Sequence, residues 1–127
     1  MEIELRALLL ADSGVSGLVG RGVNWGEQPQ HQGFPSIVLH LIGGGEGYTL
    51  DGADGVNRGR VQVDCYALEY EDAKAVSEAV NDVLSGYSGG GFQGIFAAGV
   101  RADRIGGSNE AERPFHRSLD FTFTFTN

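Results

Sequence analysis

The sequence predicts an α+β domain in which two helices pack on one face of an antiparallel sheet of about four strands. Three patterns point to this class. Residues 115–126 alternate apolar and polar side chains almost without a break, as in a strand with one buried face. Residues 69–85 repeat apolar side chains at helical spacing, and residues 36–42 and 60–68 carry two further strand patterns. Strands that follow each other closely usually pair, so we expect them to be antiparallel.

Length and composition fit one domain spanning residues 1–127. A chain of this length buries roughly 65 to 70% of its unfolded surface, which is enough for one core. The net charge of −8 argues against a nucleic-acid-binding surface, because such a surface needs clustered Lys and Arg. A single cysteine excludes an intrachain disulfide. The first residues lack the basic start of a signal peptide and no apolar run approaches the ~20 residues of a membrane span, so we expect a soluble protein in the cytosol.

The amino-terminal region predicts a helix. Residues 3–11 place leucines at helical spacing behind acidic residues that suit the positive end of the helix dipole. Residues 12–14 interrupt this helix, and one further helical turn follows before two glycines. A short extended piece is expected at residues 23–25.

Two strands should pair as a long hairpin. Residues 36–42 are apolar on both faces, which predicts a central or interfacial strand. Residues 60–68 alternate, with Val61, Val63 and Cys65 among the side chains that face the core. The side chains that face away from the core are Gln62, Asp64 and Tyr66.

Residues 43–59 form a glycine-rich connection inside this hairpin. Glycine makes up 21 of the 127 residues, roughly a sixth against a typical ~7%, and much of the excess lies here and at residues 86–94. The connection lacks the Lys-Ser/Thr pair of a phosphate-binding loop and the oxygen spacing of an EF-hand. Long connections without a core pattern are usually functional or disordered. We therefore predict a flexible hairpin arm.

The second half of the chain predicts a helix between strands. The helix over residues 69–85 should end at Gly86, and Asp72 is the one residue near its start that could cap it. A strand is expected at residues 92–105 and a turn at residues 106–113, before the final strand. We expect the phenylalanine face of the final strand to meet the apolar stripe of the helix. The opposite, polar face of the sheet then holds Gln62, Asp64, Tyr66, Asp120, Thr122 and Thr124.

No catalytic, cofactor or metal site is predicted. The three histidines lie in different segments without the spacing of a metal site. Cys65 occupies an inward strand position with no basic neighbour, as expected of a buried, unreactive thiol. No plausible triad can be assembled. Two interpretations stay open for Trp25 and Tyr48: each side chain packs against its own subunit, or it contacts a neighbouring subunit.

The order and spacing of several segments indicate a family. Residues 60–67 (RVQVDCYA) lead into a helix that begins with YEDA at residues 70–73, and the chain closes on an aromatic-alternating strand. The other matching segments are residues 8–12, 15–23, 35–39 and 117–123. Over nearly its entire length the chain resembles the tail terminator, or tail-completion, proteins of long-tailed bacteriophages and gene transfer agents.

The resemblance implies a structural virion protein of the head-tail junction, not an enzyme, that is assembled in the host cytoplasm and needs no cofactor. It implies a homo-hexameric ring on the head-proximal end of the tail tube. This ring stops further tube polymerisation and offers a docking surface to the head's connector or stopper protein. The implied partners are the tube protein and that head protein. DNA passes through the lumen without specific binding, and no membrane is involved.

We assign candidate residues to this implied role. Glycine-rich arms can reach across a neighbouring subunit at small steric cost, and the candidate ring contacts on the arm are Tyr48, Leu50, Val56 and Arg58. An acidic lumen repels phosphates over a Debye length of roughly 8 Å. The candidate lumen-facing residues are Asp64, Asp120 and Thr122.

Two alternatives from other classes stay open. A neighbouring neck component, such as a head-completion or stopper protein, binds the portal-side ring instead of the tube. A small cytosolic α+β enzyme or ligand-binding dimer needs a concave pocket with converging polar groups.

Overall fold

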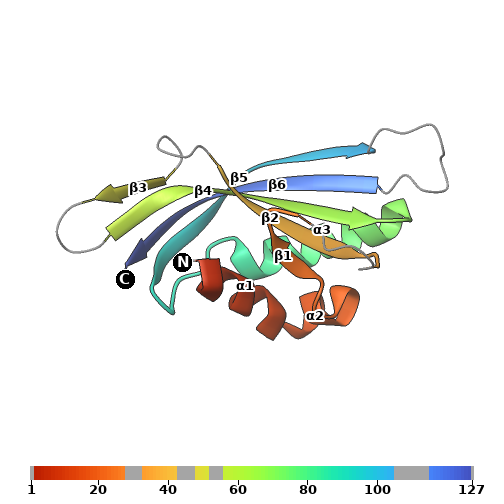
Figure 1. Cartoon of the computed structure of the whole chain (residues 1–127), viewed down its shortest axis with the longest axis horizontal. Helices are drawn as coiled ribbons and strands as arrows, with labels where there is room; N and C mark the ends of the chain where they lie inside the picture. Colours follow the sequence, from red (N-terminus) through yellow and green to blue (C-terminus); the bar gives the residue numbers. More distant parts are fainter. Residues whose placement is uncertain (1, 28–32, 43–47, 52–55, 105–114, 127) are drawn as a thin grey trace.

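A computed structural model describes residues 2–27, 33–42, 48–51, 56–104 and 115–126. In this part of the chain, three helices lie on one side of a six-stranded sheet (Figure 1). The helices are α1 (Glu2–Ala11), α2 (Ser13–Val19) and α3 (Tyr70–Leu84). The strands are β1 (Val23–Trp25), β2 (Ser36–Ile42), β3 (Tyr48–Asp51), β4 (Val56–Ala67), β5 (Phe92–Arg104) and β6 (Phe115–Thr126). The predicted α+β class is confirmed.

Strands β4 and β6 form the centre of the sheet, whose order is β1-β2-β4-β6-β5. They pair antiparallel along their full lengths, from Val56 opposite Thr126 to Ala67 opposite Phe115. On its other side, β4 pairs antiparallel with β2 through residues 60–66 and with β3 through residues 56–59. The predicted hairpin between β2 and β4 is therefore confirmed.

The sheet is wider than predicted. Six strands and three helices are described, against the expected four strands and two helices. Strand β1 is the extended piece after α2, and it runs parallel to β2, so the sheet is mixed. Helix α2 is the short segment after α1, and the side chain of Asp12 caps it by accepting the N–H of Val15 at 2.9 Å. Both short segments were expected from the sequence, but caps and neighbouring strands complete their structure.

Helix α3 runs from Tyr70 to Leu84, between the N-cap Glu69 and the C-cap Ser85. Glu69 occupies the N-cap position without a side-chain cap hydrogen bond. The expectation that Asp72 caps this helix was wrong, because Asp72 lies inside the first turn, where its charge suits the helix dipole. Gly86 has a φ of 81°, the left-handed conformation predicted for the residue that ends this helix.

The core lies between the helices and one face of the sheet. The phenylalanine face of β6 and the apolar stripe of α3 belong to one buried cluster, so the predicted contact between them is confirmed. Phe121 is fully buried, and Phe92 of β5 packs edge-on against Phe123 and Phe125. The other face of the sheet has no described helix over it (Figure 1).

Candidate functional site

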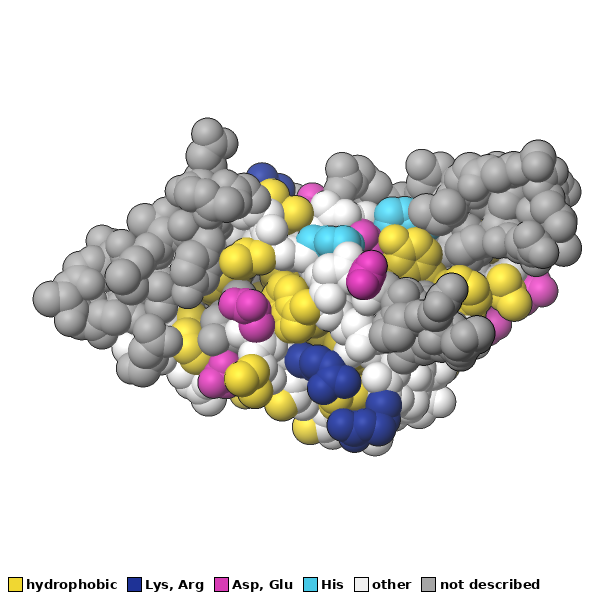
Figure 2. Space-filling view, in the orientation of Figure 1, with side chains coloured by type: hydrophobic (Ala, Val, Ile, Leu, Met, Phe, Trp, Pro, Cys, Tyr) yellow, Lys and Arg dark blue, Asp and Glu magenta, His cyan; other side chains and the backbone are white. Residues whose placement is uncertain are grey.

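A buried carboxylate lies between two imidazoles on the sheet face that points away from the helices. Asp64 of β4 is only 3% exposed. His40 of β2 places Nε2 at 3.0 Å from Asp64 Oδ2, and His116 of β6 places Nε2 at 3.0 Å from Oδ1. The side-chain amide of Gln62 donates to Oδ1 at 2.8 Å. Figure 2 shows histidine side chains reaching the surface beside acidic and apolar groups. This cluster links three adjacent strands.

The surroundings of Asp64 keep its carboxylate ionised. Burial raises the pKa of Asp64, but its contacts with His116, Gln62 and Ser118 outweigh burial and hold that pKa below its ordinary value. The buried Nε2 of His116 lies within ion-pair distance of Asp64 without the alignment of a directed hydrogen bond. The His116 ring also stacks on Tyr66, with ring centroids 4.8 Å apart and planes 10° from parallel. Burial raises the pKa of Tyr66 to about 12.

The three lumen candidates share this face but differ in exposure. Asp64, the first of these candidates, is buried in the cluster. The Asp120 side chain is 19% exposed, and its Oδ2 lies 3.6 Å from Nη2 of Arg60. Thr122 is exposed. Asp120 and Thr122 therefore remain the accessible candidates on this face.

The arm candidates lie where β3 and β4 extend beyond β2. Strand β3 pairs with β4 from Tyr48 opposite Gly59 to Asp51 opposite Val56. The same part of β4 also pairs with the end of β6. Residues 48–51 and 56–59 therefore continue the main sheet, and Arg58 is exposed there. Residues 43–47 and 52–55 of the predicted arm lie outside the described residues, as does the turn predicted at 106–113.

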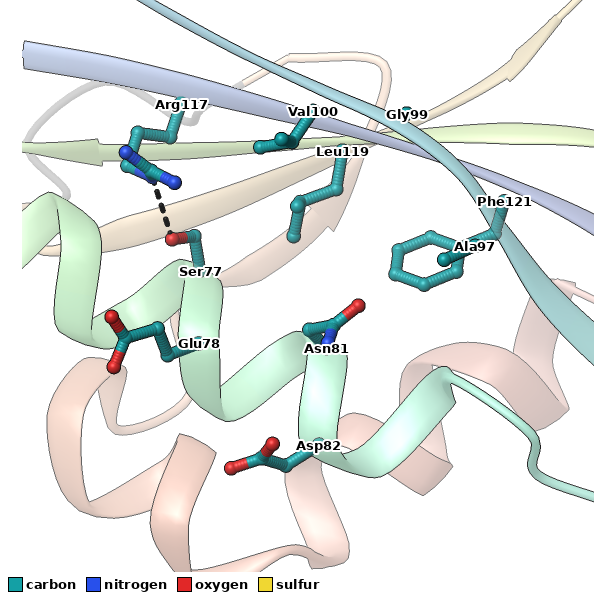
Figure 3. A pocket seen from close by; sticks show the side chains of 10 residues that line it. All are labelled: Ser77, Glu78, Asn81, Asp82, Ala97, Gly99, Val100, Arg117, Leu119 and Phe121. Carbon is teal, nitrogen blue, oxygen red and sulfur yellow. Dashed lines mark hydrogen bonds between the residues drawn. The ribbon is translucent and has the colours of Figure 1, made fainter.

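A groove of about 500 Å³ opens between α3 and the strands β5 and β6. Leu119 and Phe121 of β6 point from the sheet toward α3, where Asn81 and Asp82 form the opposite wall (Figure 3). At one end, Nε of Arg117 donates to Oγ of Ser77 at 2.8 Å. The outer wall of the groove belongs to β5, the last strand in the order of the described sheet. Helix α3 thus leaves part of the core face of β5 uncovered.

The described side chains of the other candidates have structural roles. Cys65 is fully buried, and burial raises the pKa of its thiol, as expected of an unreactive cysteine. Trp25 packs against the core and donates Nε1–H to the carbonyl of Glu2 at 3.1 Å. These contacts favour the interpretation that Trp25 packs against its own subunit. Among the described residues, no group of three or more His, Cys, Asp and Glu has the geometry of a metal site. No described helix is long and apolar enough to cross a membrane.

Two features of these surfaces were missed from the sequence. The cluster around Asp64 unites residues from three strands, and only the pairing register brings them together. The sequence held one signal of this cluster: His40, Asp64 and His116 each occupy a position of their strand that faces away from the core. The groove beside β5 leaves no mark in the sequence, since it results from where α3 crosses the sheet.

The fold defines a small α+β subunit with a groove beside β5, the last strand in the order of the described sheet. Comparison with known proteins assigns its family. The sequence matches the family described as tail completion protein gp17 over residues 3–126, so the chain belongs to that family. It is accordingly a structural protein of the phage tail and a component of the virion.

Solved structures share this fold. Twenty-eight chains of solved structures are similar to this one. One belongs to the structure "Virion of native gene transfer agent (GTA) particle"; it is 19% identical, with a TM-score of 0.70 over 97% of this chain and 92% of that chain. At this identity the likeness shows a common fold. No curated protein matches the sequence significantly.

Proposed function

We propose that this chain forms a homo-hexameric ring at the head-proximal end of the tail tube, stops tube polymerisation there, and docks the head's connector or stopper protein. The observation that carries the proposal is membership of the tail-completion family across residues 3–126. The similar chain in the gene transfer agent virion supports it, because that chain shares the fold over nearly its whole length. The proposed role is structural and not enzymatic.

The shape of the subunit suits a ring. A ring of identical subunits needs two different surfaces that meet head to tail and close by rotation. The described sheet ends in strand β5 on one side. On the other side of β4, strand β3 pairs with the part of β4 that β2 does not reach, and no described strand borders β3 beyond it. The arm candidates Tyr48, Leu50, Val56 and Arg58 all lie on β3 or the paired end of β4.

The charge of the subunit suits passage of DNA. The net charge of −8 disfavours adhesion of phosphates to the ring, and an acidic lumen acts over a Debye length of roughly 8 Å. Asp120 and Thr122 are the accessible candidates for that lumen. We assign Asp64 a structural role, because its carboxylate is buried against two histidines.

Electron microscopy of particles from the producing strain tests this function. The gene is deleted and then complemented by the intact copy. Overlong tubes, or tails that never join their filled heads, are the expected result, and complementation should restore normal particles. Normal tails that remain attached in the deletion strain would contradict the proposal.

A binding experiment separates the proposed role from that of a neighbouring neck component. The purified protein is mixed with purified tube protein and, separately, with portal or adaptor protein. Binding to the tube end is expected. Binding to the portal-side ring alone would assign the chain to head completion instead.

A further inference from the structure

Strand β5 has an outer edge that is covered over only part of its length. Ile95 directs its backbone away from β6, because its N–H donates to Tyr87 O at 3.1 Å and its C=O accepts from Gly86 at 2.7 Å. The loop after α3 thus covers the beginning of this edge. Beyond Ile95, no described strand borders β5 on that side.

The pairing register shows which backbone groups this open edge presents. Ile95 lies opposite Phe123 of β6, and Val100 lies opposite Leu119 of β6. Phe123 and Leu119 are four residues apart, whereas Ile95 and Val100 are five apart, because the register shifts between Ala97 and Gly99. In an antiparallel pair the direction of the backbone groups alternates with each residue of the partner strand. Val100 therefore directs its N–H and C=O outward, as Ile95 does. Residues 96–100 of this edge contain no charge and no proline, the usual protections of an open strand edge, and the charged residues of β5 follow at positions 101, 103 and 104.

The groove beside α3 lies directly inward of this edge. Val100 is 54% exposed and lines the groove together with Ala97, Leu119 and Phe121. A strand added to the edge of β5 would extend the sheet under α3. Its inward side chains would then fill the groove against Asn81 (Figure 3). The site thus calls for a strand with apolar residues at alternate positions.

Strand β3, which pairs with the end of β4, meets these requirements. It pairs only with β4 in the described sheet, and no described strand borders its second edge. Tyr48 and Leu50 lie at alternate positions, opposite Gly59 and Asn57. In this register Tyr48 and Leu50 alternate with Thr49 and Asp51, so one of the two sets of alternate positions in β3 is apolar.

We propose that β3 of one copy pairs with the outer edge of β5 of the next copy, with Tyr48 and Leu50 over the groove beside α3. The inference rests on the proposed ring and specifies its subunit contact. Each copy would give one strand and receive one, which is a heterologous contact that can close into a ring. The helices of successive copies would lie on the same side of a continuous sheet.

Proline substitution of the open edge tests the pairing. Val100→Pro removes an outward N–H while leaving the β6 side of the strand unchanged, and Val100→Thr keeps the amide as the matched control. Native mass spectrometry of the full-length protein, alone and with tube protein, measures assembly, and circular dichroism measures folding. We expect wild type and Val100→Thr to form rings. Val100→Pro should associate about tenfold or more weakly at each contact.

Cross-linking tests the same contact independently of that proline. Leu50→Cys and Asn81→Cys proteins are prepared separately, mixed, allowed to assemble and oxidised. A disulfide-linked dimer is expected in the mixture and in neither variant alone. The buried Cys65 should not react.

The outcomes distinguish the inference from the proposed function. Rings that persist in folded Val100→Pro, or rings of the mixed variants that form no cross-link, overturn the inference and leave the proposed function standing. A wild-type chain that stays monomeric even with tube protein overturns the ring, and the inference with it.

Discussion

Arg117 of β6 donates from Nε to Oγ of Ser77 in α3 over 2.8 Å, and this bond ties the last strand to the helix that covers it. The Ser77 hydroxyl in turn donates to the carbonyl of Lys74 at 2.8 Å. Ser77 is 2% exposed. The link lies at one end of the groove beside α3, where the proposed subunit contact is formed.

Ser77→Ala is expected to lower the free energy of unfolding by about 1–2 kcal/mol, because it leaves the Arg117 Nε–H without this acceptor. Urea unfolding followed by circular dichroism measures the change. Ser88→Ala, at an exposed serine, is the matched control and should change stability by less than about 0.5 kcal/mol. Equal stabilities for the two variants would show that the bond contributes nothing.

Asp64→Asn is expected to destabilise the protein at pH 7 by about 1–3 kcal/mol, because a neutral amide loses the close contacts of the carboxylate with His40 and His116 and accepts less strongly from Gln62. The pKa of Asp64 is lowered in the folded state, so its stabilising contribution is complete above the unfolded pKa of about 4. That contribution is lost as the pH falls through the lower folded pKa. The variant should therefore lose less stability than wild type between about pH 4 and pH 2.

Urea titrations at pH 7, 5, 4 and 3 check this pH dependence. Asp82→Asn, which changes an exposed carboxylate, is the control and should retain the wild-type acid sensitivity. Parallel losses of stability in wild type and Asp64→Asn would contradict the assignment.

Phe121→Ala is expected to cost about 3–5 kcal/mol of unfolding free energy, because this side chain is fully buried in a central strand and its loss leaves a cavity. Phe96→Ala makes the same chemical change at a side chain that is 61% exposed, and should cost less than about 1 kcal/mol. Thermal and urea unfolding of the pair measure the difference. A large loss in Phe96→Ala would instead reveal a buried role for that residue.

Gly91→Ala is expected to destabilise the protein by about 1–3 kcal/mol. Its φ is 96°, and an added Cβ would lie 2.6 Å from Cε2 of Phe125. Gly17→Ala should instead stabilise by about 0.5–1 kcal/mol, since this glycine lies in α2 with nothing within 4 Å of an added Cβ. Calorimetry of both variants checks the opposite signs, and a Gly91→Ala protein as stable as wild type would refute the steric argument.

Deletion of residues 46–56 is expected to abolish ring assembly while the monomer stays folded. The deletion removes β3 and leaves residues 60–66 of β4 paired with β2. Mass measurement in solution reports assembly, and the far-ultraviolet circular dichroism spectrum reports folding. A folded deletion variant that still forms rings would remove the arm from the subunit contact.

The sequence alone determined the parts of this protein that rest on local periodicity. The alternation in residues 115–126, the stripe of α3 and the left-handed Gly86 each follow from geometry within one element, so they could be predicted with nearly correct bounds. The inward Cys65 and the contact of the Phe121 face with α3 followed from the same alternation. Family resemblance in the order of the elements supplied the biological role.

Only the tertiary structure decided which side chains meet across strands. The burial of Asp64 between His40 and His116 depends on the registers of three strands, and a shift of one residue would move each side chain to the other face. The short strands β1 and β3 exist because they pair with β2 and β4. The groove beside β5 depends on where α3 crosses the sheet, and packing of distant residues sets that crossing, which no local pattern encodes.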